Sequence, residues 1–386
     1  MRVVALVAGL LLALPGLVAA VHLGLLAIAS WFYREPRLGR QLAVPELRFC
    51  VLVPAHNEER VLDATLAALR AAMRPYDVLV VVADRCTDST ADIARRYGAE
   101  VLERGPADEP GRAAARQDGL EFAEKFDWDV VAFVDADSII EPGFFTACER
   151  VLASDVDAVQ ARSEAARGTG LIAQAYLAAF ALQGVTIPRG RDRLRLSVRL
   201  RGTGMVLRRH VLAGHRFRAP ASEDLFYSLD LCLDGILPRH VESAKLRSAN
   251  VGNWSAAANQ RVRYEAGRMA AAKELGWPLL RARSLAGLEA AVFLLTPPIA
   301  VAAGSLLAGA TLAWLSGTRA VWVPVGGLGL LGLAVVTGLV QARAGVRTWL
   351  ALLAAPWYVA WKVVVQARAW LSLRRPGTQY GATPRA

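Results

Sequence analysis

The stretch Asp129-Val-Val-Ala-Phe-Val134-Asp135-Ala136-Asp137 decides how the middle of this chain folds. A run of apolar residues bounded by acids is typical of a strand that is buried on both faces. Two carboxylates then follow, two residues apart, where that strand should end. Such a pair can hold Mg²⁺ or Mn²⁺ against a diphosphate, because both ions prefer hard oxygen ligands. The alternative is a strand end capped by two solvated acids.

The preceding sequence repeats the same alternation of apolar strand and amphipathic helix. The pattern predicts strands over 48–54, 77–83 and 100–102, and helices over 58–72, 90–97 and 112–126. This alternation indicates an α/β domain with a parallel sheet covered on both faces. Ligands of such sheets bind beyond the carboxyl ends of the strands. Polar clusters end three strands, at His56-Asn57-Glu58, Asp84 and Asp135-Ala-Asp137, so we expect them to meet at one edge.

Two polar motifs follow this alternation. Gly202-Thr203-Gly204 lies on a predicted strand over 200–207, where glycines let a ligand approach the backbone, unless they mark a bulge. Ser222-Glu223-Asp224 precedes a predicted helix over 225–233. Asp224 is placed to act as a general base, although acids in a first turn also favour the helix dipole.

A third motif, Gln260-Arg-Val-Arg263-Tyr264, lies on a predicted helix over 254–274. Gln260, Arg263 and Tyr264 share one face by their spacing. An arginine there can neutralise a leaving diphosphate and an aromatic ring can stack on a sugar. The alternative is a solvated basic face.

Composition points to a membrane. Of the 386 residues 54% are hydrophobic, and the excess lies in the first thirty and the last hundred residues. The net charge is +11, but many arginines flank apolar segments instead of alternating with aromatic residues. Membrane lipids are therefore the expected partner of this charge, and nucleic acid is not. The four cysteines form no CxxC pair and no metal-binding spacing. Three of them sit in apolar stretches, which fits buried thiols in a reducing compartment.

The N-terminal segment Val3–Trp31 is long and apolar enough to span a bilayer. A cleaved signal peptide is the rival interpretation, but the apolar run continues past the small-residue site Val18-Ala-Ala20, which favours an uncleaved anchor. The basic flank Arg34-Glu-Pro-Arg37-Leu-Gly-Arg40 places the following domain in the cytoplasm.

Apolar segments return after Trp277. We predict a span over 285–315, kinked at Pro297-Pro298, and another over 321–340. Residues 348–373 form either a further span or an interfacial helix that keeps its arginines inside. The predicted organisation is an anchor over 1–32, a catalytic domain over 45–277, a membrane region over 285–373 and a loose basic tail over 374–386.

The order and spacing of these motifs resemble glycosyltransferase family 2. The similarity is to its processive branch, which holds the cellulose, chitin and hyaluronan synthases and the methanolan-type exopolysaccharide glycosyltransferases. The family pattern reads here as Pro54-Ala-His-Asn57-Glu58, Asp84, Asp135-Ala-Asp137, Gly202-Thr-Gly204, Glu223-Asp224 and Gln260-Arg-Val-Arg263-Tyr264. No single motif is specific, but six in the right order over residues 49–274 are.

The resemblance implies a GT-A fold, that of nucleotide-diphospho-sugar transferases, with flanking transmembrane helices. It implies a multi-pass protein of the cell inner membrane whose catalytic domain is cytoplasmic and acts as an inverting, metal-dependent hexosyltransferase. The implied roles are catalytic base for Asp224; nucleotide-sugar binding for Ala55, Asn57, Glu58, Asp84, Arg112 and Asp135; Mg²⁺ or Mn²⁺ binding for Asp137 with Asp135; and acceptor or diphosphate contact for Gly202, Thr203, Gly204, Glu223, Gln260, Arg263 and Tyr264.

Three positions depart from the family pattern. Tyr264 stands in place of Trp, Gly111-Arg112 in place of Gly-Lys, and Ser222 in place of Thr. These changes bear on processivity more than on catalysis. We therefore expect transfer from a UDP-sugar, or a similar nucleotide-sugar, to a glycan or lipid-linked acceptor in exopolysaccharide or cell-surface polysaccharide synthesis, together with export-complex proteins. The alternatives are single-sugar transfer to a polyprenyl-phosphate or other lipid acceptor, and a catalytically silent scaffold.

Overall fold

A computed structural model describes residues 2–36, 46–165, 171–218, 222–248 and 254–354. The chain divides into two compact units. The sheet unit comprises Arg34–Ala166 and Ser197–Asn250, and the helical unit comprises Met1–Tyr33, Arg167–Leu196 and Val251–Ala386. The segment predicted as one domain over 45–277 therefore contributes to both units.

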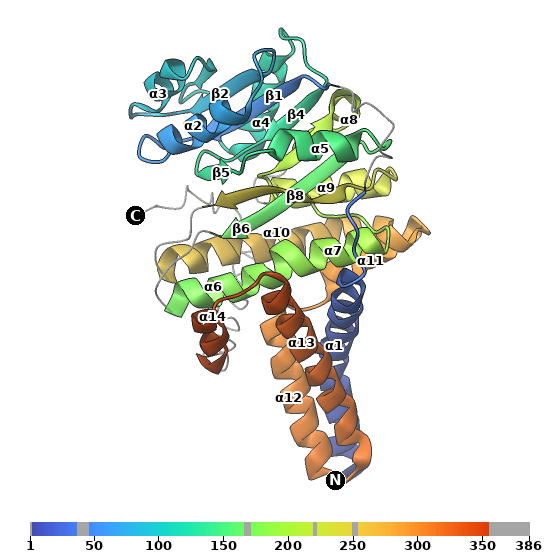
Figure 1. The fold of residues 1–386 in the computed structure, drawn as a ribbon. Helices are drawn as coiled ribbons and strands as arrows, with labels where there is room; N and C mark the ends of the chain where they lie inside the picture. Colours follow the sequence, from blue (N-terminus) through green and yellow to red (C-terminus); the bar gives the residue numbers. More distant parts are fainter. Residues whose placement is uncertain (1, 37–45, 166–170, 219–221, 249–253, 355–386) are drawn as a thin grey trace. The chain divides into compact units, whose positions relative to one another are not determined.

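The sheet unit is built on one sheet with the strand order β3-β2-β1-β4-β7-β6-β8-β5 (Figure 1). The strands are β1 (Phe49–Ala55), β2 (Val78–Asp84), β3 (Glu100–Arg104), β4 (Val130–Phe133), β5 (Ser138–Ile140), β6 (Ala158–Ala165), β7 (Met205–Arg208) and β8 (Arg239–Ser248). The helices are α2 (Leu62–Ala72), α3 (Thr90–Arg96), α4 (Arg112–Ala123), α5 (Phe144–Leu152), α8 (Arg209–Gly214) and α9 (Glu223–Leu233). This is a mixed α/β, GT-A-like fold with an open sheet, as predicted.

Both faces of the sheet are covered, because alternate residues of each central strand point to opposite sides. Val51 and Val53 of β1 pack in one cluster with Leu62 and Leu66 of α2. Leu52 packs in the other cluster, which also holds residues of α4. A fully apolar strand such as β1 is the expected sequence for a position buried on both faces.

The prediction of a parallel sheet holds for the four strands β3, β2, β1 and β4. The rest of the sheet is mixed: β7 pairs antiparallel with β4 and with β6, β5 pairs antiparallel with β8, and β6 pairs parallel with β8. The chain between β6 and β7 passes through residues 167–196 of the helical unit.

The helical unit contains the long apolar helices. Its helices are α1 (Arg2–Ser30), α6 (Leu171–Ala181), η1 (Leu182–Thr186), α7 (Ile187–Arg193), α10 (Trp254–Arg281), α11 (Leu285–Leu295), α12 (Ile299–Leu315), η2 (Arg319–Val321), α13 (Trp322–Gln341), α14 (Val346–Leu350) and η3 (Ala351–Ala354). Among the described residues, two helices, Arg2–Ser30 and Arg319–Gln341, are long and apolar enough to cross a membrane. The rest of the predicted helix over 348–373, from 355 on, lies outside the described residues.

The predicted span over 285–315 is interrupted at Pro297-Pro298, where the sequence predicted a kink. Helices α11 and α12 meet at an angle of 71° around Pro297-Pro298, so together they form either one broken span or a re-entrant segment. The freed carbonyls of Phe293 and Leu294 accept hydrogen bonds from Arg268 of α10, at 3.2 and 3.3 Å. The prolines therefore produce the predicted kink, and an arginine satisfies the helix end that they expose.

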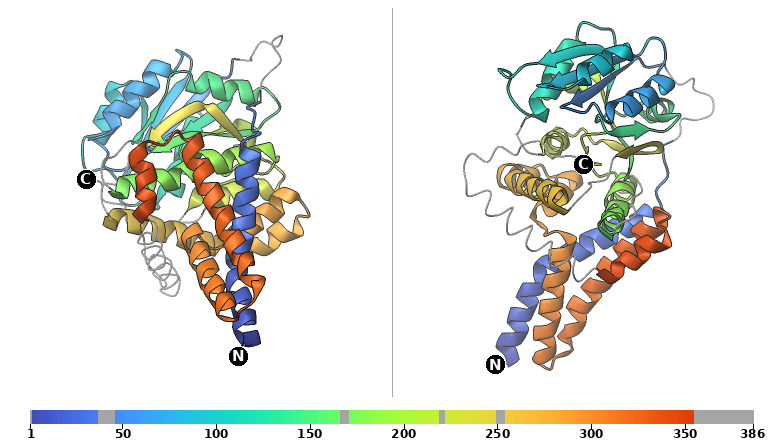
Figure 2. Two further views of the ribbon diagram at one scale, coloured as in Figure 1. Left: turned by 60° about the horizontal axis from the view of Figure 1, so that its bottom comes forward. Right: turned by 90° about the vertical axis from the view of Figure 1, so that its left-hand side faces the viewer.

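Helices α1, α12 and α13 run side by side in both views of Figure 2. Small residues allow the close approach: a Cβ on Gly9 would lie 3.0 Å from the Gly309 carbonyl oxygen, and one on Gly16 would lie 2.6 Å from the Ala302 carbonyl oxygen. Gly9 thus meets the end of α12 and Gly16 its beginning, so the two helices are antiparallel. Contacts through small residues are the usual way in which membrane helices pack.

Candidate active site

The predicted acidic motif lies directly beyond the carboxyl end of β4. The strand itself is fully buried, and Asp135 and Asp137 are each half-buried where the chain leaves it. The Asp135 backbone N–H donates to the Thr203 hydroxyl at 3.1 Å. Residues that are 68 positions apart in the chain are thereby brought together at one sheet edge.

The glycine motif holds a turn, not a strand. We predicted Gly202-Thr203-Gly204 on a strand, but β7 begins only at Met205. Gly202 and Gly204 have φ values of +77° and +70°, a left-handed conformation that glycine adopts without strain and that interrupts a ladder. Buried Gln160 holds this turn in place. Its side-chain Nε2 donates to the Thr203 carbonyl at 2.9 Å, and its Oε1 accepts from the Arg201 backbone N–H at 2.9 Å.

The second acidic motif lies at the start of α9. Ser222 is left-handed at φ +60°, and Glu223 and Asp224 form the first turn of the helix. A Cβ placed on Gly202 would lie 3.4 Å from Asp224 Oδ2, so the glycine turn and this carboxylate are neighbours. Burial and the adjacent Glu223 carboxylate raise the pKa of Asp224 to about 6. A carboxylate with a pKa near the working pH is suited to accept a proton.

The sequence interpretation missed Arg116, which joins these motifs. Its side chain is fully buried. One guanidinium nitrogen lies 2.8 Å from Glu223, and the other lies 3.4 Å from Asp135 and donates to the Gly202 carbonyl at 2.7 Å. A planar fork of donors can serve three acceptors in this way, so Arg116 holds the two acidic motifs and the glycine turn in one arrangement.

A signal for Arg116 was present in the sequence. It lies between Ala115 and Gly119 on the face of α4 that also carries buried Leu120 and Ala123. A charged residue on the apolar face of an amphipathic helix requires a buried partner. That pattern could have marked Arg116 as a site residue, although it does not identify partners 19 and 107 residues away.

Arg112 lies one helical turn before Arg116, at the first position of α4. Its Nη1 is 3.5 Å from Asp135, and its Nε is 4.0 Å from Glu223. The Asp135 carboxylate raises the pKa of Arg112 despite the opposing effect of burial, and Glu223, Asp224 and Asp137 add to the shift. The predicted residue Arg112 therefore lies among all four carboxylates of the two acidic motifs.

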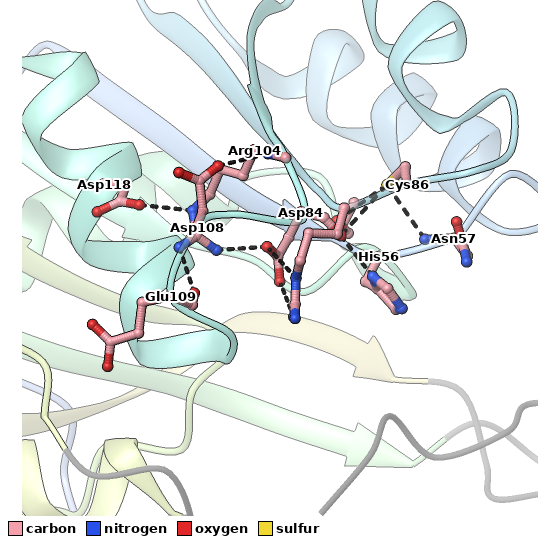
Figure 3. A network of polar contacts seen from close by, with 11 residues as sticks. His56, Asn57, Asp84, Cys86, Arg104, Asp108, Glu109 and Asp118 are labelled. Atoms are coloured by element: carbon pink, nitrogen blue, oxygen red, sulfur yellow. Dashed lines mark hydrogen bonds and ion pairs between the residues drawn. The ribbon is translucent and has the colours of Figure 1, made fainter. Parts of the chain in front are cut away.

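Asp84, at the end of β2, is buried in a network of ion pairs (Figure 3). Its carboxylate lies 2.5 Å from buried Arg104 and 3.0 Å from Arg85. Arg104 also pairs with Asp118 at 2.7 Å and donates to the Glu109 carbonyl at 2.6 Å. Asp84 is thus held rigidly at the edge of the sheet, and its contact with a base or ribose stays a prediction.

The chain beyond β1 is tied to the chain beyond β2. Asn57, left-handed at φ +54°, accepts a hydrogen bond from the Thr87 N–H at 2.8 Å. The Glu58 N–H donates to the Thr90 hydroxyl at 2.9 Å. In Figure 3 His56 points toward Asp84, and its Nδ1 lies 2.6 Å from the Asp84 carbonyl oxygen. The predicted nucleotide residues at the ends of these two strands, Ala55 among them, therefore share one edge of the sheet.

The third motif belongs to the other compact unit. Gln260, Arg263 and Tyr264 lie on α10, as predicted, and α10 is part of the helical unit. The site described so far is formed by the sheet unit alone. Their predicted contact with an acceptor stays a prediction.

The two carboxylates at the end of β4 fit a divalent metal ion that is bound together with a phosphate-containing ligand. The described residues contain no group of three or more His, Cys, Asp or Glu side chains that could hold a metal by themselves. Asp135 and Asp137 offer two hard carboxylates. Magnesium-like ions typically use one or two carboxylates and complete their shell with substrate phosphates and water. The residues present suit such a shared site and not an all-protein cage.

Comparison with known proteins gives a family and several relatives. Residues 45–267, more than half of the chain, match the family described as "Glycosyltransferase like family 2". "Probable glycosyltransferase YdaM" of Bacillus subtilis is 36% identical over 99 residues, 24% of this chain and 23% of that protein. An uncharacterized glycosyltransferase of Mycobacterium tuberculosis is 33% identical over 118 residues, 31% of this chain and 50% of that protein. The chain thus matches 23% and 50% of the length of these two curated relatives.

Solved structures with a similar fold include a mannosyltransferase from Pyrobaculum calidifontis in complex with GDP-Man and Mn²⁺. It is 18% identical, with a TM-score of 0.49, and the match covers 85% of this chain and 99% of that one. The S. aureus protein TarS in complex with UDP-GlcNAc is 15% identical, with a TM-score of 0.46, over 75% of this chain and 82% of that one.

Proposed function

This chain belongs to the family 2-like glycosyltransferases, and from that membership we propose that it transfers a sugar from a nucleotide-diphosphate sugar to an acceptor hydroxyl. The observation that supports this most is the gathering of Asp135, Glu223 and Asp224 around buried Arg116. Four carboxylates and two arginines at one sheet edge suit a reaction in which a diphosphate leaves and a hydroxyl loses a proton.

We assign the donor to the ends of β1, β2 and β4. The nucleoside, from a UDP-sugar or a similar donor, would contact Ala55, Asn57, Glu58 and Asp84. Mg²⁺ or Mn²⁺ would be held by Asp137 with Asp135, and when bound it would neutralise charge on the diphosphate. Arg112, among the carboxylates of the two acidic motifs, would supply a further positive charge to the diphosphate.

The proposed step is a single displacement. Asp224 accepts the proton of the acceptor hydroxyl as its oxygen forms a bond to the anomeric carbon. The bond from that carbon to the diphosphate oxygen breaks, and the nucleoside diphosphate leaves with the electron pair. Attack opposite to the leaving group inverts the anomeric carbon. One base is sufficient for this step, and the raised pKa of Asp224 suits the role.

The experiment is a nucleotide-release assay on the full chain in membranes or detergent. A panel of UDP- and GDP-sugars is supplied with Mn²⁺ or Mg²⁺, and nucleoside diphosphate is measured. We expect release with one donor that EDTA abolishes and Asp137→Ala strongly reduces. Asp92→Ala is the matched control, because Asp92 is an exposed aspartate paired with Arg95 on α3. Absence of release with every donor contradicts the proposed activity, and a metal-dependent signal that survives Asp137→Ala contradicts the metal assignment.

The acceptor and the place of reaction are part of the same proposal. The two long apolar helices favour an acceptor at the inner face of the cell membrane, either a growing surface polysaccharide or a lipid-linked sugar. Product length separates the two: a ladder of products indicates extension, and one added sugar indicates transfer to a lipid acceptor. A silent scaffold predicts neither product and no change of phenotype in Asp224→Asn.

A further inference from the structure

Arg112 and Arg116 face the same two carboxylates but are held very differently. The Arg116 side chain is 0% exposed and lies 2.8 Å from Glu223. The Arg112 side chain is 41% exposed and lies 4.0 Å from the same Glu223 oxygen. Arg116 is further enclosed by the rings of Phe133 and Phe217, at 5.8 and 5.7 Å. Arg116 is therefore a fixed part of the site, whereas Arg112 is an exposed cation whose contacts with the same carboxylates are longer.

These arginines flank both oxygens of the Asp135 carboxylate. Oδ1 lies 3.4 Å from Arg116, and Oδ2 lies 3.5 Å from Arg112. The positive charge of both guanidinium groups therefore opposes the binding of a further cation to Asp135. Displacement of Arg116 would leave a buried charge without its partner, which is strongly unfavourable. Displacement of Arg112 moves a guanidinium group that is already 41% exposed further into water.

The backbone just before Arg112 is open on one side. It is the first residue of α4, and Gly111 before it has a φ of +121°. A Cβ built on Gly111 would meet nothing within 4 Å, so the chain at this position is open on that side. An exposed, long side chain at the start of a helix can turn to another anion without disturbing the helix.

From this difference between the two arginines, we infer that Arg112 gives up its contact with Asp135 when a nucleoside diphosphate binds, and that a divalent metal ion then takes its place. Binding of the metal ion therefore depends on the nucleotide. The inference rests on the proposed function. Without nucleotide, Arg112 neutralises Asp135 and competes with the metal ion. A diphosphate gives Arg112 another anionic partner, which releases Asp135 to the metal. Because coupling between two ligands is reciprocal, the metal must strengthen nucleotide binding by the same factor.

The test is a Mn²⁺ titration of the full chain in detergent, with free Mn²⁺ followed by electron paramagnetic resonance. Titrations are run with and without UDP or GDP, and Mn²⁺ held by nucleotide alone is measured in protein-free buffer. We expect a nucleotide to tighten Mn²⁺ binding to the wild type at least about tenfold. Arg112→Gln should bind Mn²⁺ alone about three- to tenfold more tightly than wild type, because a competing charge is gone. Its gain from nucleotide should be correspondingly smaller.

Two control variants accompany Arg112→Gln. Arg112→Lys keeps the positive charge and should bind Mn²⁺ alone as the wild type does. Arg216→Gln removes an exposed arginine whose partner is Glu121, 3.9 Å away, and should also match the wild type. An equal rise in affinity in Arg216→Gln would indicate a general charge effect and overturn the inference.

Two other results would overturn it as well: Mn²⁺ binding to Arg112→Gln that is no tighter than to wild type, or wild-type Mn²⁺ binding that UDP and GDP leave unchanged. None of these readouts requires turnover. Failure of the proposed function is recognised separately, by the absence of nucleotide release from every donor sugar.

Discussion

Arg116 is the residue on which the arrangement of the site depends most. It is fully buried and holds Glu223, Asp135 and the Gly202 carbonyl together. We expect Arg116→Lys to lower kcat at least about tenfold, because an ammonium group cannot serve three acceptors in the geometry of a planar fork. Steady-state kinetics on the solubilised chain measure this. Arg209→Lys, at an exposed arginine paired with Glu124, is the control and should be neutral.

Complete removal of the Arg116 charge has a larger effect. Arg116→Met leaves Glu223 buried without its partner, which costs about 3–5 kcal/mol of folding stability. Thermal unfolding in detergent should therefore show a lower Tm for Arg116→Met than for Arg116→Lys. Equal Tm values for the two variants would contradict the view that the buried charge is what the site needs.

The pH dependence of the reaction should report Asp224. Its pKa is raised to about 6, so the base form that accepts the proton is present above pH 6 and is lost as the pH falls through that value. The log of kcat/KM against pH should thus show an acid limb near pH 6. Glu223→Gln removes a negative neighbour that raises the pKa of Asp224, so the limb should move to lower pH. A limb that moves to higher pH, or that stays in place, would contradict this assignment.

Individual strands and helices could be predicted from the sequence wherever a hydrophobic pattern within the segment itself defines the element. Strands β1, β2 and β4 and helices α4, α9 and α10 lie where the pattern placed them, and the acidic motifs follow β4 and begin α9 as predicted. The pattern could not find β8, whose sequence Arg-His-Val-Glu-Ser-Ala-Lys-Leu-Arg-Ser is mostly polar and is ordered by pairing with β6 and β5. It also misplaced the glycine motif, because the turn there depends on tertiary partners such as Gln160.

The glycine turn before β7 leads to a prediction about the free energy of unfolding. A Cβ on Gly204 would lie 2.1 Å from Leu246 Cδ2, and its φ is +70°. Gly204→Ala should therefore lower the free energy of unfolding by about 2–4 kcal/mol, from overpacking together with the left-handed backbone. The matched control is Gly235→Ala, at φ +78° with nothing within 4 Å, which should cost only about 1 kcal/mol. Denaturant unfolding of both variants measures the difference, and equal losses would rule out the steric part.

For the molecule as a whole, two features predict the membrane topology, that is, which side of the membrane each connection faces. They are the positive flank after α1 and the antiparallel packing of α1 with α12. Arg34 follows the end of α1, whereas Arg319 lies in the connection from α12 to α13. We propose that Arg34 faces the cytoplasm and Arg319 faces the other side.

A membrane-impermeant maleimide on intact cells should then label Arg319→Cys and leave Arg34→Cys unlabelled until the cells are opened. Of the four native thiols, Cys50, Cys148 and Cys232 are buried and Cys86 is half-buried, so labelling of the unsubstituted chain is measured as the background. Labelling of Arg34→Cys in intact cells would reverse the orientation.

In the proposed mechanism, Asp224 removes the proton of the acceptor hydroxyl during sugar transfer. The most direct test of this step is nucleotide release, with the donor found in the panel, by Asp224→Asn beside Asp230→Asn. Asp230 lies on the same helix α9 and pairs with Arg218 at 2.8 Å, so it controls for the loss of one carboxylate. We predict that Asp224→Asn lowers kcat about 10²–10⁴-fold with little change in binding of the donor, while Asp230→Asn stays near wild type. A turnover in Asp224→Asn within a few-fold of wild type would contradict the role of Asp224 as the catalytic base.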